Sequence, residues 1–320
     1  MLDEIASAGG GENAKTSLDE MRRLQDVEAR FFGEPDEVEA VRDLRVQGEG
    51  GSVLVRVYFP DPSPPHPAVM FLHGGGWALG SVERSDTLCR ALCRASGMLI
   101  ASVEYRLAPE HQFTAGLDDA YAALCWLGAN AAEIGAVPGK LAVCGDSAGG
   151  NLAAAVALMS RDRRGPEIAL QVLIYPALDP TLSEASMARL SSGYGLTRAD
   201  MQYFWELYLK SPEDAANPYA SPLREQNLRG VAPALVITAA YDPLVDEGER
   251  YAALLRDAGV RARTVRYRGM IHGFMSYLGR IDAARAAVDE CAHALADAMA
   301  TQLRRRDRRA RAGRTTKRRS

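Results

Sequence analysis

The spacing of hydrophobic positions along this chain changes near residue 68, and the change predicts the architecture. Before that point, residues 18–32 carry apolar side chains at helical spacing, and two β runs follow near 42–46 and 53–59. After the apolar run 68–73, short apolar segments alternate with segments of helical character. Such alternation predicts an α/β fold, with a mostly parallel sheet covered by helices on both faces.

The second part of the chain can be divided into individual elements. We expect its strands near 98–103, 140–144, 169–175, 233–239 and 262–267. We expect its helices near 85–96, 116–131, 148–161, 246–258 and 281–300. The aromatic-rich region 180–225 interrupts this alternation. It is therefore interpreted as an insertion that caps the carboxyl edge of the sheet, where open α/β sheets bind ligands.

Composition and charge narrow the class of protein. The chain has 320 residues, of which 47% are hydrophobic and 25% charged, as in ordinary globular proteins. Its net charge of -3 is unevenly spread, because residues 304–320 hold ten Arg or Lys and one acid. The remaining body has 28 basic and 40 acidic residues, a net charge of -12. An acidic body argues against nucleic-acid binding, and we expect the basic tail to be disordered.

The cysteines and the N-terminus indicate a compartment. Five cysteines, an odd number, do not make a disulfide framework. Cys89 and Cys93 are four apart on an expected helix with no further ligands nearby, so we predict buried packing and no metal site. The first fifteen residues lack the features of a signal peptide, and no apolar run reaches the about 18 residues of a membrane span. We expect a cytoplasmic protein without a membrane span.

One serine stands at a sharp turn from an expected strand to an expected helix. The segment 145–149, GDSAG, fits the pattern G-x-S-x-G around Ser147. Such a turn exposes the serine at the sheet edge, and the N-terminus of the following helix directs free N–H groups to the same place. These features favour a nucleophile. The alternative at this point is a serine that only caps the helix.

A glycine loop follows an apolar run earlier in the chain. The segment 73–77, HGGGW, begins where the run 68–73 ends. Consecutive glycines allow successive N–H groups to converge on one point, which a negatively charged tetrahedral intermediate requires. Such a loop is completed by the N–H of the residue after the nucleophile, here Ala148. A flexible linker and a phosphate loop are the alternatives, and no G-K-[ST] follows to support the second.

A serine nucleophile needs a base to take its proton. Five histidines are available: His66, His73, His111, His272 and His293. Only the last two follow the serine, in the chain order that this type of turn predicts, and only His272 lies in a loop after a strand. We therefore choose His272 as the base.

The acid that orients this base is expected after the preceding strand. Asp242 follows that strand directly, whereas Asp246 and Glu247 begin the next helix, where acids also serve as caps. We choose Asp242, with Asp246 second. Asp146, bonded to the nucleophile, cannot reach behind a histidine on another loop, and we expect it to anchor the turn or to hydrogen-bond near the glycine loop.

Together these segments resemble the hormone-sensitive-lipase-like esterases, the bacterial family IV group of the α/β-hydrolase superfamily. The matching segments are HGGGW (73–77), YRLAPEH (105–111), LDDAYAALCWL (117–127), GDSAGGNLAA (145–154), DPLVDEG (242–248) and HGF (272–274). The resemblance implies an α/β-hydrolase fold with an eight-stranded sheet, antiparallel only near its start. It also implies N-terminal cap helices in residues 1–42, a catalytic domain over 43–303 and a cap insertion at 180–225. The tail 304–320 has no counterpart in the family.

The resemblance further implies a chemistry. The family's triad falls on Ser147, Asp242 and His272, and its oxyanion N–H groups fall on Gly75, Gly76 and Ala148, supported by Gly74. Family members mostly hydrolyse short- to medium-chain acyl esters without a cofactor, and some form homodimers through the edge strand. The expected partner is thus a small-molecule ester.

Other activities share this constellation. A deacetylase, lactonase, amidase or lipase uses the same triad, so these remain alternatives to a carboxylesterase. A ligand-binding module is a different class, exemplified by plant gibberellin receptors, which share the fold but lack the histidine. The presence of His272 argues against that class. As substrate-pocket walls we expect the following side chains, with burial in the core as the alternative for each: Trp77, Tyr194, Tyr203, Ile271 and Phe274.

Overall fold

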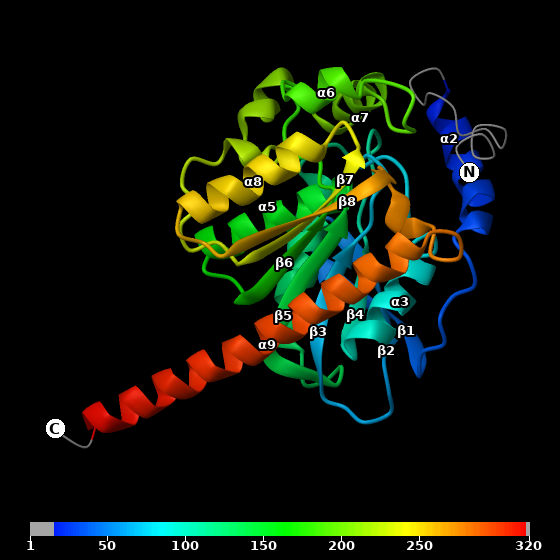
Figure 1. Ribbon diagram of the computed structural model, residues 1–320. Coiled ribbons are helices and arrows are strands. Elements are labelled where there is room, and N and C mark those ends of the chain that lie inside the picture. Colours follow the sequence, from blue (N-terminus) through cyan, green and yellow to red (C-terminus); the bar gives the residue numbers. More distant parts are fainter. Residues whose placement is uncertain (1–15, 318–320) are drawn as a thin grey trace.

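The computed structural model describes residues 16–317 and contains an eight-stranded sheet between layers of helices (Figure 1). Its strands are β1 (Ala40–Gly48), β2 (Gly51–Phe59), β3 (His66–Leu72), β4 (Leu99–Glu104), β5 (Ala136–Asp146), β6 (Ile168–Ile174), β7 (Ala234–Tyr241) and β8 (Ala262–Ile271). They lie in the order β1-β2-β4-β3-β5-β6-β7-β8. Only β2 runs antiparallel to its neighbours, and all other pairs are parallel. The predicted fold class is therefore confirmed.

Five helices cover the two faces of the sheet. They are α3 (Asp86–Ser96), α4 (Ala115–Ala129), α5 (Ala148–Asp162), α8 (Val245–Asp257) and α9 (Asp282–Lys317). Side chains of α3 and α9 form one core with Val69 and Phe71 of β3. Side chains of α4, α5 and α8 form the other core with Met70 and Leu72. Successive residues of β3 thus face opposite cores. A parallel strand that is buried on both faces is therefore apolar throughout.

The cap consists of two separate segments at the carboxyl end of the strands (Figure 1). The first is α2 (Leu18–Glu28), which begins at the N-cap residue Ser17 and continues into the 3₁₀ turn Ala29–Phe31. The second lies between β6 and β7 and holds α6 (Ala185–Arg189) and α7 (Arg198–Tyr208), at the place of the expected insertion. Helix α6 was not predicted, because five residues are too few to establish a helical period.

The ends of the chain differ from the prediction in one respect. Helix α9 was expected to end near residue 300, but it continues to Lys317 and extends away from the rest of the molecule (Figure 1). The disorder predicted for the tail 304–320 stays a prediction; α9 includes residues 304–317, where arginine and alanine are good helix formers. Residues 318–320 and the first fifteen residues of the expected cap region 1–42 lie outside the described residues.

Two further expectations can be compared with the structure. All five cysteines are free, and Cys89 and Cys93 are buried as predicted. Within residues 16–317, every helix is too short or too polar to cross a lipid bilayer. In the same residues, no group of three or more His, Cys, Asp or Glu side chains is arranged to hold a metal ion.

Candidate active site

Ser147 lies at the turn between β5 and α5, in an unusual backbone conformation. Its φ of 54° and ψ of -117° fall in a region that non-glycine residues rarely adopt. The turn requires small residues on both sides. A Cβ on Gly149 would lie 2.0 Å from the carbonyl oxygen of Leu72, and one on Gly145 would lie 2.2 Å from that of Gly149. The G-x-S-x-G pattern thus reflects close backbone contacts that hold the serine in a strained position.

His272 connects the serine to an acid on a third loop. Its Nε2 lies 2.9 Å from Ser147 Oγ, and its Nδ1 lies 2.8 Å from Asp242 Oδ2. Asp242 is fully buried, and its other oxygen accepts a hydrogen bond from the N–H of Leu244 at 2.9 Å. That bond fixes the carboxylate, which in turn fixes the imidazole. The three residues, separated by up to 125 positions in the chain, form one continuous hydrogen-bonded line.

The other two acids considered for this role have different partners. Asp246 accepts a hydrogen bond from the N–H of Ser186 at 2.8 Å and so holds helix α6 of the cap. Glu247 accepts one from the N–H of Leu178 at 3.1 Å, and burial raises the pKa of its carboxyl. Both acids therefore position the loop and helix after β6.

The glycine loop presents free N–H groups beside the serine. Gly75 and Gly76 have φ values of 120° and 57°, which favour glycine. Among the described residues, no hydrogen bond uses the N–H of Gly75, Gly76 or Ala148, and all three line the cavity that contains Ser147. Gly74 differs, because its N–H donates to Asp146 Oδ1 at 2.8 Å. It therefore supports the loop, and the other three N–H groups are available to an oxyanion.

Asp146 ties the nucleophile turn to the glycine loop. Burial raises the pKa of its carboxyl to about 6, although the hydrogen bond from Gly74 acts in the opposite direction. The neighbouring His73 is also buried, which lowers its pKa to about 4 and keeps it neutral. Its ring stacks on Tyr105 with 4.2 Å between the centroids. Both residues hold the loop in place, which for Asp146 is one of the two roles expected from the sequence.

The cavity over Ser147 has a volume of about 270 Å³. Of the five predicted pocket residues, Trp77 and Ile271 line it. Trp77 is only 2% exposed, and its indole stacks on Tyr208 of α7 with 4.5 Å between the centroids. Trp77 therefore joins the glycine loop to the cap, and only a small part of it can reach a substrate.

Three of the predicted pocket residues lie elsewhere. Phe274 is completely buried and packs against Tyr175 and Tyr267, so its assignment to the pocket is corrected to the core. Tyr194 stacks on Tyr241, with 5.1 Å between the centroids, and does not line the cavity. Tyr203 does not line it either, and the next residue on α7 does instead. Neighbouring residues on a helix point about 100° apart, so proximity in sequence misled here.

Most of the side chains that form the walls were not predicted from the sequence. From α7 these are Met201 and Phe204, which have the i, i+3 spacing of one helix face, a signal that was available. From α2 they include Met21, Leu24, Gln25 and Glu28. The apolar face of α2 was recognised, but nothing in the local pattern indicates that this face lies over the serine.

Comparison with known proteins agrees with this geometry. Residues 69–276 match a family model described as an alpha/beta hydrolase fold. The carboxylic ester hydrolase LipN of Mycobacterium tuberculosis is 45% identical over 243 residues, which cover 74% of this chain and 64% of LipN. The chain belongs to the hormone-sensitive-lipase-like esterases.

Solved structures extend the match across the whole family fold. A hyperthermophilic esterase from the archaeon Pyrobaculum calidifontis superposes with a TM-score of 0.84 at 44% identity, covering 89% of this chain and 92% of that one. The thermostable carboxylesterase EstE1 from a metagenomic library gives 0.86 at 42% identity, covering 89% and 98%. At 89% of the chain, each match extends beyond residues 69–276 of the family model.

Proposed function

We propose that this family IV member is a serine carboxylesterase that hydrolyses short- to medium-chain acyl esters through an acyl-enzyme. The observation that carries the proposal is the hydrogen-bonded line of Ser147, His272 and Asp242, at 2.9 and 2.8 Å, at the edge of a cavity. The relatives LipN and EstE1, described as a carboxylic ester hydrolase and a carboxylesterase, support the same class of reaction.

The first half of the reaction forms the acyl-enzyme. Ser147 Oγ attacks the ester carbonyl carbon while His272 Nε2 accepts the hydroxyl proton. Asp242 holds the imidazole by its Nδ1–H and stabilises the imidazolium. The carbonyl oxygen becomes an oxyanion, which the N–H groups of Gly75, Gly76 and Ala148 stabilise, each by about 3 kcal/mol in the barrier. His272 then gives the proton to the alcohol oxygen, the C–O bond breaks, and the alcohol leaves.

The second half repeats these steps with water. His272 takes a proton from a water molecule, whose oxygen attacks the acyl carbon of the serine ester. The tetrahedral intermediate uses the same N–H groups and collapses with return of the proton to Ser147 Oγ. The products are a carboxylic acid and the free enzyme. All residues required for both halves belong to this chain.

The proposal extends to location and assembly. The five free cysteines agree with a reducing, cytoplasmic environment. Strand β8 pairs with β7 along one side and ends the sheet among the described residues. An edge strand of this kind can pair with a second copy, which would give a homodimer through β8.

Replacing the nucleophile tests the proposal directly. We expect Ser147→Ala to abolish hydrolysis of p-nitrophenyl butyrate, because no oxygen remains to form the acyl-enzyme. The melting temperature should not fall, because alanine fits the same turn and, among the described residues, Ser147 Oγ bonds only to His272. Retention of activity in this variant would refute the mechanism. In the wild type, a p-nitrophenyl acyl series from acetate to palmitate should peak near four carbons, whereas a rise toward sixteen carbons would indicate a lipase.

A further inference from the structure

The cavity over Ser147 has two chemically different walls. One wall is apolar and comes from α7, the loop before it and the end of β8, with Leu196, Met201, Phe204 and Ile271. The other wall comes from α2, the start of α3 and the turn after β8. Its polar members are Gln25, Glu28, Arg84, Ser85, Ser276 and Tyr277, and they lie among apolar residues of the same segments, Met21, Leu24, Phe31, Phe32 and Leu88. An ester has two substituents on either side of its carbonyl, so the walls can distinguish one from the other.

The charges on the polar wall neutralise each other. Arg84 Nη2 donates to Glu28 Oε2 at 2.5 Å, and its Nη1 donates to the carbonyl oxygen of Gln25. The hydroxyl of Tyr277 donates to the other oxygen of Glu28. The guanidinium also lies 4.8 Å from the centre of the Phe32 ring. The pair therefore carries no net charge and is held from three sides.

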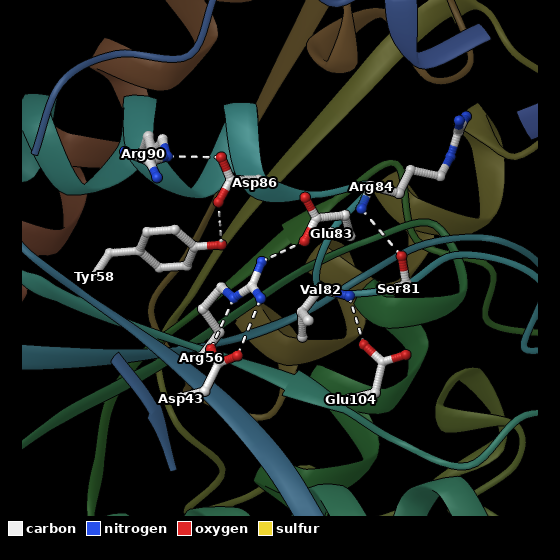
Figure 2. Close-up of polar contacts among 10 residues, drawn as sticks. All are labelled: Asp43, Arg56, Tyr58, Ser81, Val82, Glu83, Arg84, Asp86, Arg90 and Glu104. Atoms are coloured by element: carbon white, nitrogen blue, oxygen red, sulfur yellow. Dashed lines mark hydrogen bonds and ion pairs between the residues drawn. The ribbon is translucent and has the colours of Figure 1, made fainter. Parts of the chain in front are cut away.

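The segment that carries Arg84 is itself anchored to the sheet. Arg56 donates to Glu83 at 2.6 Å, and Tyr58 donates to Asp86 at 2.9 Å. Figure 2 shows these contacts on one side of the segment, with the side chain of Arg84 pointing away from them. Because both ends of the cluster are held, the groups of the polar wall are already in position when a substrate enters.

Several groups on this wall are free to bind a substrate. Gln25 Oε1 accepts the N–H of Gly80 at 2.9 Å, which orients the amide and leaves its NH₂ group as a donor. Within residues 16–317, the hydroxyls of Ser85 and Ser276 make no hydrogen bond, and both residues line the cavity. Each hydroxyl can donate and accept. An alkyl chain placed here would displace water from these groups without replacing its hydrogen bonds, which is unfavourable.

We propose that this polar wall is a subsite that selects esters carrying hydroxyl groups on one side of the scissile bond. A substrate hydroxyl can donate to and accept from the free groups of this wall. A charged substituent would find no opposite charge left uncompensated, because Arg84 and Glu28 neutralise each other. Ser85 and Ser276 are the specificity-determining residues, and the apolar wall takes the other substituent. The inference rests on the proposed esterase function and adds the class of substrate.

Two matched pairs of substrates test the subsite. For the alcohol side, 2,3-dihydroxypropyl butyrate is compared with n-propyl butyrate, which has the same carbon chain. For the acyl side, 4-nitrophenyl 3-hydroxybutyrate is compared with 4-nitrophenyl butyrate. We expect the hydroxylated ester to have the higher kcat/KM in one pair, and that pair identifies which substituent occupies the polar wall.

A double variant tests the residues. In Ser85→Ala/Ser276→Ala, the ratio of kcat/KM for the hydroxylated over the alkyl ester should fall about tenfold in the selective pair, as expected for lost hydrogen bonds. The control Ser63→Ala changes an exposed serine that is not among the lining residues, and it should keep the wild-type ratio. Equal kcat/KM within both pairs, or an unchanged ratio in the double variant, would overturn the subsite. Failure to hydrolyse any of the four esters would instead overturn the proposed function.

Discussion

At the scale of single residues, three acids follow β7 within six positions, and their bonding partners separate them. Asp242 bonds to the imidazole, whereas Asp246 bonds to a backbone N–H of helix α6 and Glu247 to one of the loop after β6. The distinction matters because an amide in place of Asp242 can hold the imidazole only in the wrong tautomer. A neighbouring acid that bonds elsewhere provides a matched control.

We expect Asp242→Asn to lower kcat by about 10⁴-fold, because Nδ1 of His272 would lose its acceptor. Asp246→Asn should keep kcat within about tenfold, because its partner is the N–H of Ser186 in the cap. Kinetics with p-nitrophenyl butyrate and thermal melting of both variants provide the measurement. Equal losses of kcat in the two would show that the acid has been assigned incorrectly.

Asp146 predicts a pH dependence of stability. Its pKa of about 6, raised from the usual 3.8, means that the folded state keeps a proton which the unfolded chain has lost between these values. The contribution of this residue to the free energy of unfolding therefore falls as the pH rises from about 4 to about 6, by up to about 3 kcal/mol. Asp146→Asn cannot titrate. In urea unfolding, the free energy of unfolding of the variant minus that of the wild type should therefore increase between about pH 4 and about pH 6. Parallel pH profiles of the two proteins would contradict the raised pKa of Asp146.

At the scale of elements, helix α7 determines how much space remains beside the glycine loop. The ring of Phe204 lies so close that a Cβ on Gly76 would be 2.3 Å from its Cγ. Trp77 stacks on α7 from the same loop. The cap and the loop therefore share one interface, and a change in the cap is expected to affect both the substrate range and stability.

We expect Phe204→Ala to shift the preferred p-nitrophenyl ester toward longer acyl chains, because the lost ring enlarges the cavity. The same change should lower the free energy of unfolding by about 3–5 kcal/mol, as for other buried aromatic truncations. Tyr203→Ala is the control, since this neighbour does not line the cavity. A shift of the same size in the control would mean that the helix as a whole, and not the ring, limits the chain length.

At the scale of the whole molecule, charge is divided between an acidic body and a basic end of α9. Residues 304–320 carry ten of the 38 basic residues. The last side chain of α9 in the described core is Met299. The C-terminal part of this helix extends away from the sheet (Figure 1).

We expect removal of residues 304–320 to leave kcat/KM for p-nitrophenyl butyrate and the melting temperature unchanged. We expect the full chain to bind a negatively charged resin in a salt-sensitive way through this basic segment. The truncated chain has a net charge of -12, so it should lose that retention. Chromatography over a salt gradient measures this. A loss of activity on truncation would show that the basic segment acts on the catalytic body.

The sequence by itself determined the fold class, the order of the catalytic candidates and the glycine loop. These depend on the periodicity of apolar residues and on which residue follows which strand, and carboxyl ends of parallel strands share one edge. The tertiary structure alone decided that Phe204 and not Tyr203 faces the cavity and that Arg84 meets Glu28 across 56 positions. The reason is that a local pattern shows which face of an element is apolar, whereas the angle and depth at which elements dock depend on packing between distant segments.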